Sequence, residues 1–130
     1  IPVLEPRSKD TFYPGRIYLA PANYHMYVDI GNKIHLSVEE PIHHSRPSID
    51  LTFISAAHTF RDQLITILLS GANKDGAMGI KKAADAGGIT IVQDPKTADV
   101  PVMIQAALQL TKVTHVYTIP QIIDFLVKLK

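Results

Sequence analysis

The spacing of apolar residues along the chain changes its period at Pro47. Before it, short apolar runs alternate with turn residues, which is typical of β-strands. Gly31 and Asn32 separate two of these runs. The pattern therefore predicts that residues 24–30 and 33–38 pair as an antiparallel hairpin.

Beyond Pro47 the apolar residues recur at the helical period, and these stretches alternate with short apolar runs. The first helix is predicted over residues 50–61, with Ser48 as its N-cap and Asp50 in its first turn. Residues 64–69 are almost wholly apolar, which predicts a strand buried on both faces. The remaining predicted elements are a helix at 75–86, a strand at 89–92, a helix at 102–108, a strand at 113–118, and a final helix that opens at Pro120 with Ile122, Ile123, Leu126 and Leu129 facing inward.

This order of elements predicts the fold class. Strands that alternate with helices form parallel pairs joined by right-handed crossovers. We therefore expect an α/β fold with a doubly wound, mostly parallel sheet, helices on both faces of that sheet, and an antiparallel hairpin near the N-terminus of the chain.

Composition narrows the class of protein. The chain has 130 residues, of which 46% are apolar and 19% are charged, and this suits one globular domain with a sizeable core. A net charge of +1 gives no basic surface for nucleic acid, and no apolar run reaches the roughly 18 residues of a membrane span, so we expect neither partner. The lack of cysteine removes disulfides and thiolate chemistry, and a cytoplasmic location is the expected default.

The chain opens on an apolar segment rather than on a polar terminus. Ile1 is not an initiator methionine, and the first four residues, IPVL, have the composition of a strand inside a domain. We expect further residues upstream; the alternative is a chain boundary at a domain edge.

The loop that follows residues 64–69 is the first candidate site, because ligands bind beyond the carboxyl ends of parallel strands. Residues 68–79 read LLSGANKDGAMG and place Asp75 where a helix is predicted to begin. From its position alone, Asp75 is a helix N-cap. The glycines match neither a dinucleotide fingerprint nor a phosphate-binding loop, so the sequence gives no support for nucleotide binding.

Neither the histidines nor the serines form a pattern typical of a metal or nucleophile site. Of six histidines, His43 and His44 are adjacent on a predicted loop, and no helical His-x-x-x-His pair occurs. We expect surface or strand histidines and no metal site. None of the six serines lies in a Gly-x-Ser-x-Gly turn, so the chain by itself shows no candidate nucleophile.

Four segments taken together resemble one family. They are IYLAPANYH at 17–25, RPSID at 46–50 followed by SAA at 55–57, LSGANKDGAMG at 69–79, and AGGITIVQDPKTADVPVM at 86–103. In this order they are similar to the catalytic domain of CheB-type chemoreceptor methylesterases. In this resemblance residues 1–130 correspond to the C-terminal two-thirds of that catalytic domain.

The resemblance implies hydrolysis of glutamate methyl esters, and often deamidation of glutamines, on the cytoplasmic regions of chemotaxis receptors. The family uses a Ser-His-Asp triad and no metal or organic cofactor. Its Gly-x-x-x-Asp-Gly stretch matches residues 71–76, which implies that Asp75 is the triad acid and holds the tautomer of the histidine. Its backbone oxyanion donor matches Ala72, in a loop shared with Gly71 and Asn73.

The chain departs from the family pattern at several places. Ala72 stands where the family has methionine and Asn73 where it has glycine, which retains a backbone donor but changes the wall of the pocket. Ile104 stands where the family has proline. The family's serine and histidine belong to segments that would precede Ile1, so only the acid of the triad is expected in this chain.

Three interpretations stay open at the level of the sequence. The first is a methylesterase that acts, as the complete domain, on a methylated chemotaxis receptor and carries a covalently linked response-regulator receiver domain. The second is a catalytically inactive domain of the same fold that binds a receptor or another signalling partner. The third is an unrelated α/β ligand-binding protein.

Overall fold

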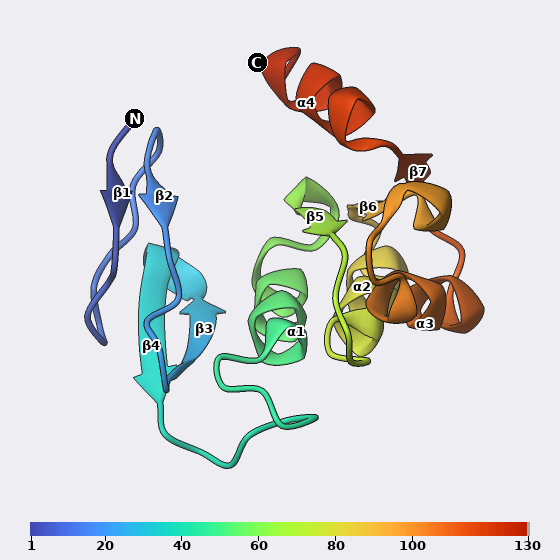
Figure 1. Cartoon of the computed structure of the whole chain (residues 1–130). Helices are drawn as coiled ribbons and strands as arrows, with labels where there is room; N and C mark the ends of the chain where they lie inside the picture. The colour runs from blue at the N-terminus through green and yellow to red at the C-terminus, as the bar shows by residue number, and fades with distance from the viewer. Residues whose placement is uncertain (130) are drawn as a thin grey trace.

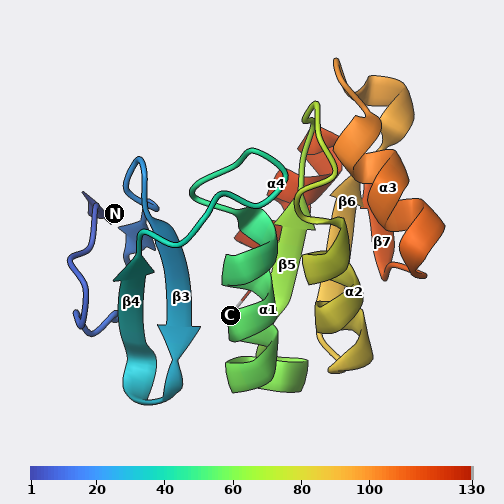
Figure 2. The same cartoon turned by 90° about the horizontal axis from the view of Figure 1, so that it is seen from below.

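A parallel sheet lies at the centre of the computed structural model, which describes residues 1–129 (Figure 1). Its strand order is β5-β6-β7, and both pairs of neighbours are parallel. The strands are β5 (Ile65–Leu68), β6 (Ile89–Gln93) and β7 (His115–Tyr117). One face of the sheet carries three helices and the other carries one (Figure 2). The three are α1 (Ile49–Phe60), α2 (Ala77–Asp85) and α3 (Val102–Leu110), and the single helix is α4 (Ile119–Val127).

The N-terminal part of the chain forms two small strand pairs, of which the hairpin of β3 and β4 lies beside α1 (Figure 2). β1 (Val3–Leu4) pairs in parallel with β2 (Ile17–Tyr18), and β3 (His25–Asp29) pairs antiparallel with β4 (Lys33–Ser37). Gly31, in the turn of the β3-β4 hairpin, has a φ of 72°, in the left-handed region that glycine adopts most readily. Short 3-10 turns occupy Ile30–Asn32, Arg61–Gln63 and Pro95–Thr97.

Polar contacts join the hairpin to α1. The Thr52 hydroxyl donates to the Met26 carbonyl at 2.6 Å, and the Val28 N–H donates to the Ser55 hydroxyl at 3.0 Å. The Met26 carbonyl and the Val28 N–H both belong to β3. β3 therefore lies along α1, and these contacts fix the hairpin to that helix.

The core lies between the sheet and the two helices α2 and α3. Its buried members are aliphatic or small: Leu68, Ala77, Ile80, Val92, Met103, Ile104 and Ala107. α1 and α2 approach each other closely, because a Cβ at Gly79 would lie only 2.6 Å from the Cβ of Phe53. Glycine at this position therefore allows the two helices to come together.

The predicted fold class and elements are confirmed. The hairpin, all four helices and all three strands of the parallel sheet form where the apolar pattern predicts them, with bounds that differ by about two residues at most ends. No helix within residues 1–129 is long and apolar enough to cross a membrane.

The predicted inward face of α4 is largely wrong. Ile122 is buried, but Ile123, Leu126 and Leu129 are 55%, 44% and 48% exposed. The reason is that α4 packs mainly against β6 and β7, and no other helix of the described residues lies on that face of the sheet.

The prediction that residues 64–69 are buried on both faces holds only in part. Thr66 and Leu68 are buried, whereas Ile65 and Ile67 are half-buried and Leu69 is 45% exposed. β5 has β6 on one edge and no strand on the other among the described residues, which leaves that side of the strand open.

Candidate active site

The loop beyond the carboxyl end of β5 is held against the start of α3. The Gly71 N–H donates to the Val100 carbonyl at 2.9 Å, and the Met103 N–H donates to the Gly71 carbonyl at 3.1 Å. A Cβ on Gly71 would overlap the Met103 sulfur, so a larger residue here would require the Met103 side chain to move. These contacts anchor the first half of the loop that contains Ala72, Asn73 and Asp75.

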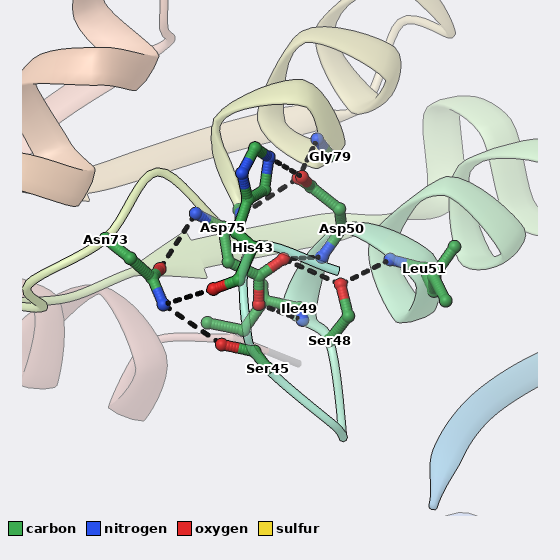
Figure 3. Close-up of polar contacts among 10 residues, drawn as sticks. His43, Ser45, Ser48, Ile49, Asp50, Leu51, Asn73, Asp75 and Gly79 are labelled. Carbon is green, nitrogen blue, oxygen red and sulfur yellow. Dashed lines mark hydrogen bonds and ion pairs between the residues drawn. The ribbon is translucent and has the colours of Figure 1, made fainter. Parts of the chain in front are cut away.

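Asp75 ends this loop and is buried, with 2% of its surface exposed. Its Oδ1 accepts hydrogen bonds from the Ser48 hydroxyl at 2.7 Å and from the Asp50 N–H at 3.0 Å. Its Oδ2 accepts from the Ile49 N–H at 2.6 Å (Figure 3). All three donors belong to the N-terminal end of α1, so Asp75 satisfies donors that the helix cannot satisfy itself.

The prediction that Asp75 caps the helix that follows it is therefore wrong. α2 begins at Ala77, after Gly76 with a φ of 102°, and the side chain that caps α2 is Asp50. Asp50 Oδ1 accepts from the N–H groups of Gly76 at 2.9 Å and of Gly79 at 2.8 Å. The two helices exchange caps: Asp75, which lies just before α2, satisfies the N-terminus of α1, and Asp50, in the first turn of α1, satisfies the N-terminus of α2.

Asp50 carries a clear electrostatic perturbation. Burial raises the pKa of Asp50 above its ordinary value, and the charge of Asp75 raises it further, while hydrogen bonds from Gly79 and Gly76 act in the opposite direction. The second oxygen, Oδ2, lies 4.0 Å from Nε2 of His43, which is half exposed. That distance allows attraction to a protonated His43 but is too long for a hydrogen bond.

Ser48 links Asp75 to a buried histidine. The Ser48 N–H donates to Nδ1 of His25 at 3.1 Å, and the other ring nitrogen, Nε2, lies 2.9 Å from the Glu40 carbonyl oxygen. Because Nδ1 accepts, the ring proton is on Nε2 and donates to that carbonyl. Ser48 and His25 are 1% and 0% exposed. The contacts form a continuous polar path from Glu40 to Asp75.

Ser48, His25 and Asp75 are the residue types of a hydrolase triad without its arrangement. In a triad the histidine lies between the serine hydroxyl and the acid. Here the Ser48 hydroxyl donates directly to Asp75, and His25 bonds only to the Ser48 backbone. All three side chains are also buried, which denies a substrate carbonyl access to the hydroxyl. Ser48 is therefore not placed as a nucleophile.

The three residues proposed for the oxyanion loop differ in what they offer. Gly71 already donates its N–H to the Val100 carbonyl, whereas Ala72 is exposed and its N–H makes no hydrogen bond to a described residue. Asn73 ties the loop in place through its side chain: its Oδ1 accepts from the Asp75 N–H at 2.9 Å and its Nδ2 donates to the Ser45 hydroxyl at 3.0 Å. The backbone N–H of Asn73 also has no partner among the described residues, but Asn73 is less exposed than Ala72.

The histidines of the described residues are dispersed. No group of three or more His, Asp or Glu side chains within residues 1–129 is placed to hold a metal ion. His35 Nε2 lies 3.3 Å from Asp29 on the hairpin, and His115 stacks on Tyr117 with ring centres 4.6 Å apart. His25, His35 and His115 thus each have a local contact of their own.

Comparison with known proteins assigns the family. The family model described as CheB methylesterase matches residues 1–126. The chain belongs to the CheB methylesterase family. It is 36% identical over 129 residues to the protein-glutamate methylesterase/protein-glutamine glutaminase of Clostridium acetobutylicum, and the match covers 99% of this chain and 37% of that protein.

Two further comparisons support the same family. A Leptospira interrogans protein that carries the same name with a provisional qualifier is 37% identical, and the match covers 99% of this CheB-family chain and 67% of the relative. The crystal structure of the Thermotoga maritima CheB methylesterase catalytic domain superimposes with a TM-score of 0.89 at 27% identity, over 97% of this chain and 68% of that domain. The chain thus spans about two thirds of that catalytic domain.

Sequence reasoning found Asp75 and its loop but missed its neighbours. Ser48 was assigned only as the cap of α1, which the structure confirms through a bond from the Leu51 N–H at 3.4 Å. The roles of Asp50 and His25 were not foreseen. A signal was available, because Ser48 and Asp50 belong to the RPSID segment, which is one of the four segments that together resemble the CheB family.

Proposed function

We propose that the protein carrying this chain hydrolyses glutamate methyl esters and deamidates glutamines on the cytoplasmic regions of chemotaxis receptors. The names of the Clostridium and Leptospira relatives give both activities. A Ser-His-Asp triad performs the reaction in this proposal, with Asp75 as its acid. The serine and the histidine come from the part of the relatives' length that this chain does not span.

The observation that carries the assignment is the hydrogen-bond capacity left on Asp75. A carboxylate has about four acceptor sites, two on each oxygen. Oδ1 accepts two hydrogen bonds and Oδ2 accepts one from the described residues. One acceptor site therefore stays open, on Oδ2, and a histidine N–H approaching from outside this chain would fill it. A carboxylate whose only function is to cap α1 does not require that site.

The surroundings of Asp75 suit the role of a triad acid. Three donors at the N-terminus of α1 hold the carboxyl group in place, and a histidine needs such an oriented acid beside it when it accepts the proton of the serine. The exposed N–H of Ala72, in the same loop, would stabilise the oxyanion that forms when the serine attacks the ester carbonyl. This proposal requires no metal and no organic cofactor.

The proposal also includes partners and a location. The substrate is a methylated chemotaxis receptor, and a response-regulator receiver domain is covalently linked to the catalytic domain. Support comes from the length of the relatives, because the match covers only 37% of the Clostridium protein and leaves room for a further domain. A cytoplasmic location follows from the substrate that we propose.

The test is a methyl-ester hydrolysis assay on the full-length protein with Asp75→Asn. We expect kcat to fall by several orders of magnitude, about 10⁴-fold, because the amide cannot hold the histidine in the required tautomer. Asp85→Asn is the matched control: Asp85 is an exposed acid on α2, paired only with Lys81 at 2.9 Å. It should leave kcat unchanged. Full activity in Asp75→Asn would contradict the assignment of the acid.

The second candidate is the inactive binding module. It is favoured by one observation: Ser48, the serine that contacts Asp75, is buried and donates directly to the acid, so it is not placed as a nucleophile. A full-length wild-type protein that hydrolyses no methyl ester, yet binds a chemotaxis receptor in a sedimentation assay, would support it.

A further inference from the structure

We infer that Ser48 is a positioning residue for Asp75: its hydroxyl fills the second acceptor site of Oδ1, so that the open acceptor site for the catalytic histidine is the one on Oδ2. The inference rests on the proposed role of Asp75 as the triad acid. It concerns how that acid is held, which the family membership alone does not specify.

The direction of the Ser48 hydroxyl proton is determined by its contacts. The oxygen accepts a hydrogen bond from the Leu51 N–H at 3.4 Å, so its proton is free to point to Asp75 Oδ1, 2.7 Å away. Ser48 is 1% exposed, and water cannot easily replace either contact. The resulting hydrogen bond to a charged acceptor is short and of the strong class.

The hydroxyl fills an acceptor site that the backbone donors leave open. Asp50 N–H and Ile49 N–H contact one oxygen each, at 3.0 and 2.6 Å. With Ser48, Oδ1 has both acceptor sites filled and Oδ2 has one. Without Ser48, each oxygen would have one open site, and a histidine could approach either. The hydroxyl therefore decides which oxygen stays available.

Ser48 is itself held from the other side by β3. His25 Nδ1 accepts from the Ser48 N–H at 3.1 Å, and His25 is anchored at the Glu40 carbonyl at 2.9 Å. Both contacts are buried or partly buried. The contact between Ser48 and His25 uses the backbone N–H of Ser48 and leaves its hydroxyl free. The hairpin thereby positions the serine without competing for its proton.

The test compares Ser48→Ala with Ser55→Ala in the full-length protein, using the methyl-ester assay. Loss of a hydrogen bond to a charged group should lower kcat by about 10- to 100-fold and leave KM unchanged, since Ser48 does not reach the substrate. Ser55 is the matched control on the same helix: its hydroxyl accepts from the Val28 N–H at 3.0 Å and donates to the Thr52 carbonyl at 2.9 Å, away from Asp75. Its loss should leave kcat unchanged.

A double-mutant cycle separates positioning from a general loss of structure. In the Asp75→Asn background, Ser48→Ala should lower kcat no further, because the group that it positions is gone. Unchanged kcat in Ser48→Ala, or an equal loss in both backgrounds, would overturn the inference. Activity retained by Asp75→Asn alone would instead overturn the proposed function. If Ser48→Ala does not fold, Ser48→Cys, which keeps the size but donates only weakly, takes its place in the same cycle.

Discussion

The N-termini of α1 and α2 are both capped by a buried aspartate, but the two aspartates differ in the donors that hold them. Each is capped by an acid from the start of the other: Asp75, just before α2, caps α1, and Asp50, in the first turn of α1, caps α2. Asp75 receives three hydrogen bonds, one of them from the Ser48 hydroxyl. Asp50 receives two, both from backbone N–H groups, and its second oxygen has only His43 nearby, at 4.0 Å.

The comparison shows how two buried acids in contact can serve different purposes. A side-chain donor adds direction to the Asp75 carboxylate and leaves one defined acceptor site for an incoming group. Backbone donors alone hold Asp50, and burial together with the charge of Asp75 raises the pKa of Asp50. The first arrangement suits a catalytic acid, and the second suits a joint between helices.

Replacing each acid by alanine should have the largest effect and should separate the two caps. Asp75→Ala leaves the Ser48 hydroxyl and two backbone N–H groups buried without an acceptor, and should lower the free energy of unfolding by about 3–5 kcal/mol. Asp50→Ala leaves two such donors and removes an acid with a raised pKa, so about 1–2 kcal/mol is expected. Urea unfolding of the full-length protein measures both. Equal losses would contradict the distinction.

Widening the gap between α1 and α2 should weaken both caps at once. The expected loss in the free energy of unfolding is smaller than that for Asp75→Ala. Gly79→Ala places a Cβ 2.6 Å from the Cβ of Phe53, which is too close for two carbon atoms. The resulting overpacking should lower the free energy of unfolding by about 1–3 kcal/mol. Lys82→Ala, on the exposed side of α2, is the control and should change stability by less than about 0.5 kcal/mol. A thermal unfolding scan distinguishes them. A stabilised Gly79→Ala variant would show that helix propensity outweighs the close contact.

The smallest expected effect concerns the pH dependence of stability. The pKa of Asp50 is higher in the folded state than the value of 3.8 that applies when the chain is unfolded. Between these two values the folded state binds more protons, so the contribution of Asp50 to stability decreases as pH rises through that window. Asp50→Asn should lack this decrease. Urea midpoints measured from pH 3.5 upward test it, and identical slopes in wild type and variant would contradict it.

Local rules predicted the elements well because each depends on residues that are close in sequence. The Gly31-Asn32 turn and the Ser48 cap are examples, and both are confirmed. The prediction that Asp75 caps the next helix was wrong, because the N-cap rule considers only the helix that follows in the sequence. Gly76, with a φ of 102°, turns the chain so that Asp75 faces a helix that precedes it.

The rest of the site depends on contacts that no local pattern records. Asp75 meets Ser48 across 27 positions, and Asp50 meets Gly79 across 29. Such partners become visible only when the fold brings α1 and α2 together. The exposed apolar side of α4, with Ile123 at 55% exposure, has a similar cause: the helical period correctly marks one face as apolar, but the period does not say how much of it the sheet covers.

The exchanged caps also bear on the local motions of the domain. Amide hydrogens in the first turn of a helix ordinarily exchange with solvent quickly, because no carbonyl within the helix protects them. The amides of Ile49 and Asp50 are protected by Asp75, and those of Gly76 and Gly79 by Asp50. None of the four can open by fraying of its own helix alone. Their exchange should therefore be slow, and its rate should report the separation of the two helices as one event.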